Sequence, residues 1–265
     1  MSAMDLVRIQ TDGRIATVSF DTGAKANALS QKLMRELTEA ARLFAGDPAI
    51  SAVVLTGRAE NFTMGADLRD PEGVDVRRLG LAERRVRLRT GPAMCEAWEA
   101  VDALTICAIE GWCVGGGAAL AVSCDLRVAS DTATIYVPEV ERGMNMSWGS
   151  IPRFVALVGP ARAKRIAGLC EKVSAQTALG WGLVDHITPP GGALAKAREI
   201  AEAAAKLPPT ALKMVKQDVN VAALALAKAT AHRDLEAFAL MQQTDDFKEG
   251  VKAFFEKRDP DFTGD

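Results

Sequence analysis

The chain has 265 residues, of which 49% are hydrophobic and 25% are charged, and its net charge at pH 7 is −2. This length and hydrophobic content suffice for a sizeable core in one large domain, with or without a small appendage. The near-neutral charge gives no electrostatic case for nucleic-acid binding. The apolar stretch at 111–124 is too short and too rich in glycine to span a bilayer.

Cysteine and histidine usage excludes several kinds of site. The five cysteines form no CxxC pair and their number is odd, so we expect free buried thiols in a reducing cytoplasm. His186 and His232 are the only histidines and lie far apart in the sequence, which argues against a metal site and against a Ser-His-Asp triad. The first residues show no basic start followed by an apolar run, so we expect no secretory signal.

The first half of the chain alternates between predicted strands and helices. Ser30 is a suitable N-cap for an amphipathic helix that runs to about Ala45. Short apolar or β-branched runs predict strands at 15–20, 52–56, 104–109, 126–129 and 134–137. Strands that alternate with helices favour parallel βαβ-type packing and an α/β fold.

The second half, after about Ser147, is mostly helical in its pattern. We expect helices at 147–157, 160–169 and 175–180, a short strand at 183–187, a helix that ends near 206, a long helix at 208–241 and a last one at 247–257. This alanine- and leucine-rich tail either caps the core or forms contacts between subunits.

An arginine-rich segment occupies residues 71–90, and its pattern predicts a helix. Its six arginines are Arg77, Arg78, Arg84, Arg85, Arg87 and Arg89. One interpretation is a solvated helix face. The other is a mobile cover over a site, where it would meet an anionic ligand.

Two glycine-rich turns, at 61–68 and 111–119, follow two of the predicted strands, and each is expected to begin a helix. A helix start exposes unpaired N–H groups and the positive end of the helix dipole. Two such starts directed at one point would stabilise a carbonyl oxygen that gains charge during a reaction. The alternative is that the glycines only allow close packing of helix and strand. Neither turn matches a phosphate-binding loop.

The order and neighbours of these motifs resemble the crotonase superfamily, also called the enoyl-CoA hydratase/isomerase family. The resemblance covers nearly the whole chain. Its motifs are Asn27-Ala28-Leu29-Ser30, Gly65-Ala66-Asp67-Leu68, Gly115-Gly116-Gly117, Cys124-Asp125-Leu126-Arg127-Val128-Ala129, Pro138-Glu139-Val140, Ala178-Leu179-Gly180-Trp181-Gly182-Leu183-Val184-Asp185 and the segment 249–258.

The resemblance implies a crotonase-like spiral of ββα turns over residues 1–195 and a helical C-terminal region over 196–265. It also implies a homotrimer or a dimer of trimers, and an acyl-CoA thioester as substrate with no further cofactor and no metal. By this match, the N–H groups of Ala66 and Gly116 would hold the thioester oxygen. Glu139 would act as acid and base, although a glutamate at the end of a strand is otherwise read as a surface carboxylate.

The sequence departs from the family where hydratases carry a second glutamate, because Ala119 stands there. No acid occurs between Gly143 and Arg153 either, which argues against dehalogenase-like and dienoyl-isomerase chemistry. We expect Met146 and Trp148, in that interval, to shape the acyl pocket or simply to pack in the core.

Several residues are expected to contact coenzyme A through the resemblance. Lys25 would approach the nucleotide end, and Asp67 and Leu68 would contact the adenine or pantetheine. Phe254 and Lys257 match positions that reach the coenzyme A of a neighbouring subunit, although a lysine at a helix end is also simply solvated.

We therefore expect a cytoplasmic enzyme that hydrates an enoyl-CoA or shifts its double bond, with Glu139 as its single acid/base. One alternative is a family member that cleaves a C–C bond or decarboxylates the acyl group. The other is an acyl-CoA-binding assembly subunit that has lost catalysis, which the missing second glutamate supports.

Overall fold

A six-stranded sheet forms the centre of the protein, which is described by a computed structural model over residues 4–75, 79–225 and 227–265. Its strand order is β1-β2-β3-β4-β6-β9, and only the β1–β2 pair is antiparallel. The strands are β1 (Val7–Asp12), β2 (Ile15–Phe20), β3 (Ala52–Thr56), β4 (Leu104–Ile109), β6 (Leu126–Ser130) and β9 (His186–Thr188). The alternation of strands and helices therefore produced the predicted α/β fold.

A second, smaller sheet lies next to the first and gives the chain its spiral path. It contains β5 (Trp112–Val114), β7 (Thr134–Tyr136) and β8 (Val173–Ser174). Each turn of the spiral adds one strand to each sheet and then a helix. The clearest units are β4, β5 and α5 (Gly116–Ala121), followed by β6, β7 and α6 (Ser150–Ala167). Isolated bridges from Leu29 to Ala66 and from Thr63 to Cys113 continue the pattern in the earlier turns.

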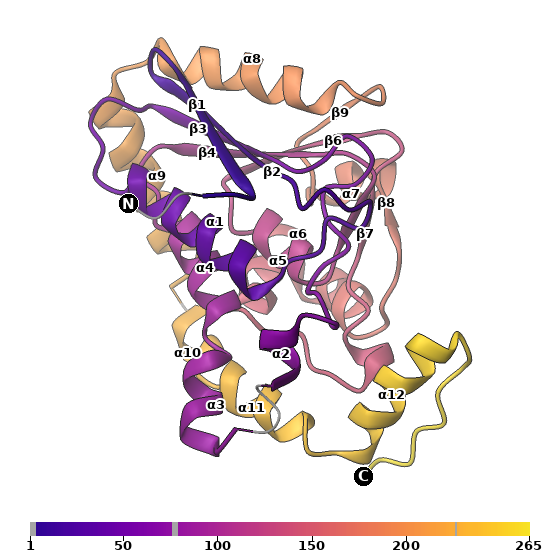
Figure 1. Ribbon diagram of the computed structural model, residues 1–265. Helices are drawn as coiled ribbons and strands as arrows, with labels where there is room; N and C mark the ends of the chain where they lie inside the picture. The colour runs from indigo at the N-terminus through magenta and orange to yellow at the C-terminus, as the bar shows by residue number, and fades with distance from the viewer. Residues whose placement is uncertain (1–3, 76–78, 226) are drawn as a thin grey trace.

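Helices cover both faces of the main sheet (Figure 1). On one face, α1 (Gln31–Phe44), α4 (Thr90–Glu99) and α5 enclose the larger hydrophobic core. On the other face, α8 (Ala193–Ala205) lies along the strands and buries a stripe of alanines against them. Alanine lets the helix backbone approach the sheet closely, so this face needs little side-chain volume. The stripe consists of Ala193, Ala197, Ala201 and Ala204.

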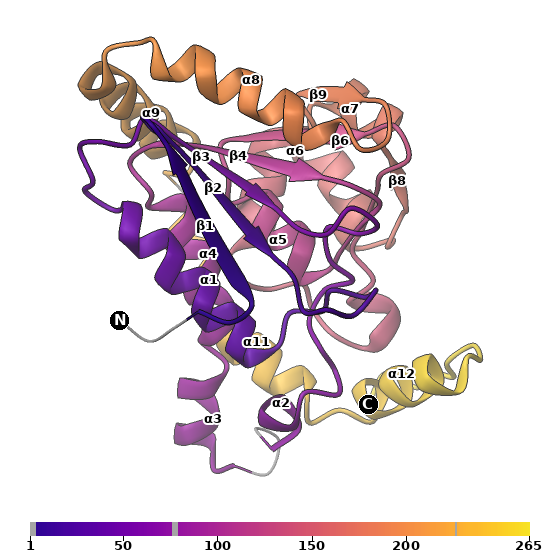
Figure 2. The ribbon, with the colours of Figure 1, turned by 45° about the horizontal axis from the view of Figure 1, so that its top comes forward.

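After α9 (Pro209–Ala223), which lies beside the end of α8, the C-terminal helices extend to the opposite end of the molecule, where α11 (Asp234–Met241) and α12 (Asp245–Glu256) lie (Figures 1 and 2). Three helices occupy the region where we predicted one long helix at 208–241, so that prediction was wrong. They are α9, α10 (Ala227–Ala231) and α11, and α12 follows. The backbone leaves helical geometry at Leu224, with φ −110° and ψ 18°. The break lets α11 return to the core, where Asp234 accepts a 2.8 Å hydrogen bond from the Gly149 N–H.

Other expectations were met more closely. The strands at 15–20, 52–56 and 104–109 and the Ser30 cap lie as predicted, and Ser30 accepts a hydrogen bond from the Leu33 N–H. The helix expected from 147 begins at Ser150, because Trp148 and Gly149 have positive φ. The arginine-rich segment holds two short helices, α2 (Pro71–Asp75) and α3 (Leu81–Arg87), and Arg77 and Arg78 lie outside the described residues.

Two predictions about the whole chain concern the thiols and the membrane. All five cysteines are buried and free of disulfides, as expected. Within the described ranges, none of the helices has both the length and the apolar character needed to cross a bilayer.

Candidate active site

The two glycine-rich turns lie side by side, although they are about fifty residues apart in the sequence. The Thr63 N–H donates to the Trp112 carbonyl, and the Val114 N–H donates to the Thr63 carbonyl, both at 3.0 Å. A Cβ placed on Gly65 would lie only 3.6 Å from the Gly116 nitrogen. The backbone ladder between 63 and 112–114 therefore fixes the relative position of Ala66 and Gly116.

The N–H groups of Ala66 and Gly116 differ from those around them. Their neighbours are paired: the Asp67 N–H donates to the Leu29 carbonyl at 3.1 Å, and the Gly115 N–H donates to the Tyr136 carbonyl at 2.8 Å. The described residues offer no acceptor to either Ala66 or Gly116. Both residues line the same cavity. Two free donors are therefore available to one oxygen atom in that cavity.

The two turns are not equivalent, which corrects one expectation. Gly116 is the first residue of α5, so its N–H lies at a helix start as predicted. The first turn does not begin a helix, because the chain at Ala66 pairs with Leu29 and α2 starts only at Pro71. The donor at Ala66 is thus positioned by a short β-bridge, and the helix-dipole argument applies to one turn only.

Glu139 lies directly against the second glycine-rich turn. It follows β7 and precedes the 3₁₀ helix η2 (Val140–Arg142). A Cβ on Gly115, whose φ is +51°, would lie 2.6 Å from Glu139 Oε1, so the carboxyl group requires a glycine there. Its Oε2 atom is buried and has no hydrogen-bond partner among the described residues.

This environment changes the acidity of Glu139. Burial raises the pKa of its carboxyl group to about 7, although a backbone hydrogen bond and the charge of Arg142 act in the opposite direction. A carboxyl group with a pKa near neutrality can both accept and return a proton at physiological pH.

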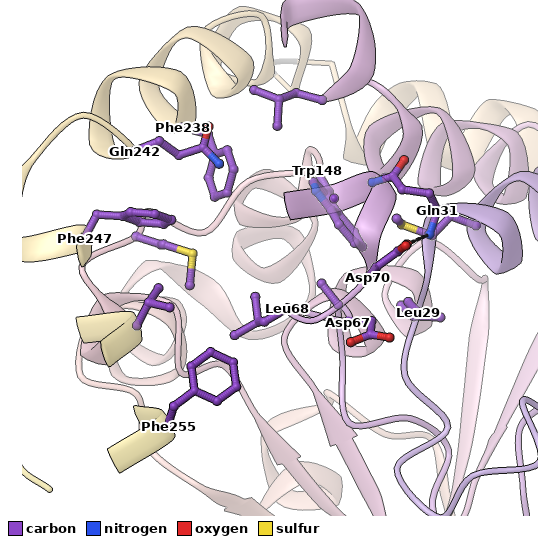
Figure 3. A pocket seen from close by; sticks show the side chains of 17 residues that line it. Leu29, Gln31, Asp67, Leu68, Asp70, Trp148, Phe238, Gln242, Phe247 and Phe255 are labelled. Carbon is purple, nitrogen blue, oxygen red and sulfur yellow. Dashed lines mark hydrogen bonds between the residues drawn. The ribbon is translucent and has the colours of Figure 1, made fainter. Parts of the chain in front are cut away.

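The space in front of these groups has two connected parts. The inner cavity contains Ala66, Gly116 and Glu139 together with Arg142, Asn145 and Met146. The outer chamber lies between α1, the residues after the first turn, and the C-terminal helices. In Figure 3, Phe238, Gln242, Phe247 and Phe255 line one side of this chamber, and Leu29, Gln31, Asp67 and Asp70 line the other. The residues common to both parts are Ala66, Leu68, Met144, Trp148 and Phe238.

The predicted site residues fall into two groups. The structure brings Ala66, Leu68, Gly116, Glu139, Met146 and Trp148 to the inner cavity, and Asp67 to the outer chamber. Lys25, Phe254 and Lys257 line neither part. Lys25 and Lys257 are exposed, and Lys257 ends α12 with a φ of +56°. The Phe254 ring packs on the Arg142 guanidinium, 4.1 Å from the ring centroid.

Several lining residues were not predicted from the sequence. In α12, the residues that face the outer chamber are Phe247, Val251 and Phe255, which follow one another at intervals of four. That spacing defines one face of a helix and could have identified them, whereas Phe254 belongs to the adjacent face. Arg142, Asn145 and Phe238 carry no comparable sequence signal, because their place depends on how η2 and α11 fold against the turns.

Ala119, Glu141 and the described part of the arginine-rich segment supply no group to the inner cavity. Ala119 is fully buried within α5 and supplies no acid. Glu141 is exposed and accepts a hydrogen bond from the Tyr136 hydroxyl. In the arginine-rich segment, Arg85 forms an ion pair with Glu236 of α11 at 2.8 Å, and none of its described arginines lines the inner cavity or the outer chamber.

The fold and the cavity together define a class of protein. It is an α/β spiral in which two free backbone N–H groups and one buried carboxyl group share a cavity with an apolar extension. The model of the enoyl-CoA hydratase/isomerase family matches residues 10–265, and the chain belongs to this family.

Relatives of known name support the same family. The chain is 35% identical over 254 residues to a putative enoyl-CoA hydratase of Thermus thermophilus, with 94% of this chain and 98% of the relative covered. It is 30% identical over 256 residues to a short-chain-enoyl-CoA hydratase of Clostridium acetobutylicum, with 95% of each covered. It is also 30% identical over 254 residues to a 2,3-dehydroadipyl-CoA hydratase of Escherichia coli, with 95% and 96% covered.

Solved structures confirm the fold. A crystal structure of an enoyl-CoA hydratase from Mycobacterium avium subsp. paratuberculosis superposes with a TM-score of 0.86 at 23% identity, covering 98% of this chain and 100% of the other. An enoyl-CoA hydratase/isomerase from Pseudoalteromonas atlantica gives a TM-score of 0.85 at 25% identity, with the same coverage. The spiral that the resemblance implied is therefore the fold of this family.

Proposed function

We propose that the protein is a cytoplasmic acyl-CoA enzyme that hydrates an enoyl-CoA or shifts its double bond, with Glu139 as its single acid/base. The observation that carries this proposal is the shared cavity of three groups: the free N–H donors of Ala66 and Gly116, and the unpartnered Oε2 of Glu139. Family membership supports acyl-CoA processing, and these three groups support the enolate step.

The proposed hydration balances with one carboxylate. Glu139 takes a proton from water, and the oxygen of that water forms a bond to Cβ. The electron pair of the C=C bond moves toward the thioester, whose oxygen becomes negative and is held by the two N–H groups. The enolate then takes the proton back from Glu139 at Cα, and the carboxylate is restored.

Isomerisation uses the same groups without water. Glu139 removes the α-proton of a 3-enoyl thioester, the charge moves to the thioester oxygen, and the same proton returns at Cγ. Both reactions share the enolate that the N–H groups stabilise. Because Ala119 stands in place of a second glutamate, the bound substrate determines whether hydration or isomerisation occurs.

The remaining functional assignments are part of the proposal. Lys25, Asp67 and Leu68 contact the coenzyme A portion of the substrate. Phe254 and Lys257, which line neither cavity of their own chain, reach the coenzyme A bound to a neighbouring subunit. The assembly is a homotrimer or a dimer of trimers, with residues 1–195 as the spiral core and 196–265 as the helical region that closes the site. Coenzyme A enters as part of the substrate, and no other cofactor takes part.

A panel of coenzyme A thioesters with a mass-spectrometric readout tests the proposal. Enoyl, saturated, aromatic and dicarboxylic thioesters are incubated with the wild-type protein and with Glu139→Gln. A gain of 18 mass units identifies hydration, and an isobaric product with a displaced alkene identifies isomerisation. Removing the acid/base is expected to lower kcat about 10²- to 10⁴-fold.

Other outcomes of the same panel would favour the alternatives. Loss of carbon dioxide or of an acyl fragment would identify the decarboxylating or C–C-cleaving reaction. Binding without turnover across the whole panel would identify a non-catalytic acyl-CoA-binding subunit. Full turnover by Glu139→Gln would exclude Glu139 as the acid/base.

A further inference from the structure

The indole ring of Trp148 occupies the space that two glycines leave open. A Cβ on Gly91 of α4 would lie 2.1 Å from Trp148 Cε2, and a Cβ on Gly116 would lie 2.4 Å from its Cζ3. The ring is therefore packed between α4 and the residue that supplies the second N–H donor. A side chain on either glycine would displace it.

The backbone of Trp148 is held in an uncommon conformation by groups from three helices. Its φ is +61°, a region that bulky residues rarely adopt. Arg153 of α6 donates to the Trp148 carbonyl at 3.0 Å and pairs with Glu99 of α4 at 2.6 Å. The N–H of the next residue, Gly149, donates to Asp234 of α11 at 2.8 Å. Such a conformation persists only where the surroundings enforce it, and here the enforcing hydrogen bonds fix the position of the indole ring.

The indole also lies at the junction of the two cavities. Trp148, Leu68 and Phe238 line the outer chamber (Figure 3), and all three also line the inner cavity. An acyl group whose thioester oxygen is bound at Ala66 and Gly116 must pass this ring to reach the outer chamber. The Trp148 ring therefore limits the shape of the acyl groups that can reach the outer chamber.

The residues that line the outer chamber indicate which acyl groups can bind past the Trp148 ring. Four of its 17 lining residues are aromatic, namely Trp148, Phe238, Phe247 and Phe255, although only 5% of the chain is aromatic. Its charged lining residues are Asp67 and Asp70, and no lysine or arginine of the described chain lines it. A flat apolar group gains aromatic packing there, whereas a carboxylate meets two like charges.

We infer that Trp148 is a specificity-determining residue that selects acyl groups that are flat beyond the reacting carbons, and that the acidic lining of the outer chamber disfavours a charged end on the same acyl group. This inference rests on the proposed binding of a thioester at Ala66 and Gly116. It extends that proposal to a substrate class without a terminal carboxylate, which argues against the anionic ligand considered for the arginine-rich segment.

Two matched pairs of unreactive saturated thioesters test shape and charge separately by calorimetric binding. 3-Phenylpropanoyl-CoA and 3-cyclohexylpropanoyl-CoA share a carbon skeleton and differ in flatness. Hexanoyl-CoA and adipyl-CoA share a chain length and differ in the terminal carboxylate. We expect the wild type to bind the phenyl thioester about three- to tenfold more tightly than the cyclohexyl one, and hexanoyl-CoA at least about tenfold more tightly than adipyl-CoA.

The variants assign each preference to its residue. Trp148→Leu should bring the phenyl-to-cyclohexyl ratio close to one and leave the hexanoyl-to-adipyl ratio unchanged. Gly91→Ala should lower the first ratio in the same way, because it displaces the ring without altering Trp148 itself. Asp70→Asn, at the acidic lining residue that is not assigned to the coenzyme A portion, should narrow the second ratio alone. Trp181→Phe, a substitution on α7 away from both cavities, is the control and should change neither ratio.

The outcomes separate this inference from the proposed function. Binding of all four thioesters without discrimination, or an unchanged phenyl preference in both Trp148→Leu and Gly91→Ala, would overturn the inference and leave the enolate chemistry standing. Failure of the wild type to bind any thioester would overturn the proposed function itself. Thermal unfolding of each variant establishes that the compared proteins are folded.

Discussion

The inner cavity and the outer chamber are built in different ways. The N–H donors of the inner cavity are positioned by the backbone of the spiral core, where Gly65, Gly115 and Gly116 approach neighbouring atoms too closely for a side chain. The outer chamber is formed by side chains of helices that meet only in the folded protein, among them Phe238 of α11 and Phe255 of α12. The chemistry thus depends on backbone geometry, and the choice of acyl group depends on side-chain packing.

Among substitutions outside the reacting groups, the largest effect is expected where the two turns touch. A Cβ on Gly117 would lie 2.3 Å from Thr63 Cγ2. Gly117→Ala should therefore separate the turns, lower stability by about 1–3 kcal/mol and reduce kcat/KM about 100-fold. Adding Thr63→Ser removes that methyl group but keeps the hydroxyl that donates to the Asn27 carbonyl at 2.6 Å. The double variant should recover most of both losses, and no recovery would contradict the proposed contact between the turns.

The pH dependence of the rate reports on the carboxyl group of the inner cavity. Because burial raises the pKa of Glu139 to about 7, and the carboxylate form must accept the first proton, kcat/KM should fall as the pH drops below about 7. The decrease approaches tenfold per pH unit. The residual activity of Glu139→Gln should lack this limb. A wild-type profile that stays flat from pH 5.5 to 8 would contradict the assignment.

The same raised pKa predicts that Glu139 destabilises the fold. The native state holds the proton up to about pH 7, whereas the unfolded chain loses it near pH 4.5, so stability declines as the pH rises through this interval. Glu139→Gln should therefore be more stable than the wild type by about 1–3 kcal/mol at pH 8 and equally stable at pH 4.5. Denaturant unfolding at both pH values measures the difference. A variant that is less stable at pH 8 would show that the carboxylate is well solvated.

A smaller effect, on binding rather than on chemistry, is expected in the outer chamber. Phe255→Ala should raise KM for an acyl group that reaches this chamber about three- to tenfold and leave kcat within about twofold. Phe254→Ala is the matched comparison, since Phe254 adjoins Phe255 but lines neither cavity of its own chain. The dependence of KM on acyl-chain length is measured for both variants. If Phe254→Ala changed this dependence as much as Phe255→Ala does, the face of α12 that carries Phe255 would not be the one that lines the chamber.

The sequence predicts the inner cavity better than the outer chamber for a physical reason. The strands at 52–56 and 104–109 are continuous buried runs, and the turns after them carry their signal locally. The resemblance to a known family then links Ala66, Gly116 and Glu139. The outer chamber depends on the breaks that divide the region 208–241 into three helices and on the interaction of Asp234 with Gly149, and neither leaves a local pattern. The spacing of Phe247, Val251 and Phe255 could have predicted that they share one helix face. It could not have predicted which residues lie opposite that face across the chamber.

Hydrogen exchange at the α-carbon of a saturated thioester tests the central claim most directly. Butyryl-CoA has no double bond to hydrate or shift, so incorporation of deuterium from heavy water reports only proton removal by the acid/base beside an oxygen held by Ala66 and Gly116. The account predicts a gain of one mass unit with the wild type, because one carboxyl group reaches only one face of the enolate, and none with Glu139→Gln. Exchange by Glu139→Gln at the wild-type rate, or no exchange by a wild-type protein that turns over enoyl-CoA, would contradict it.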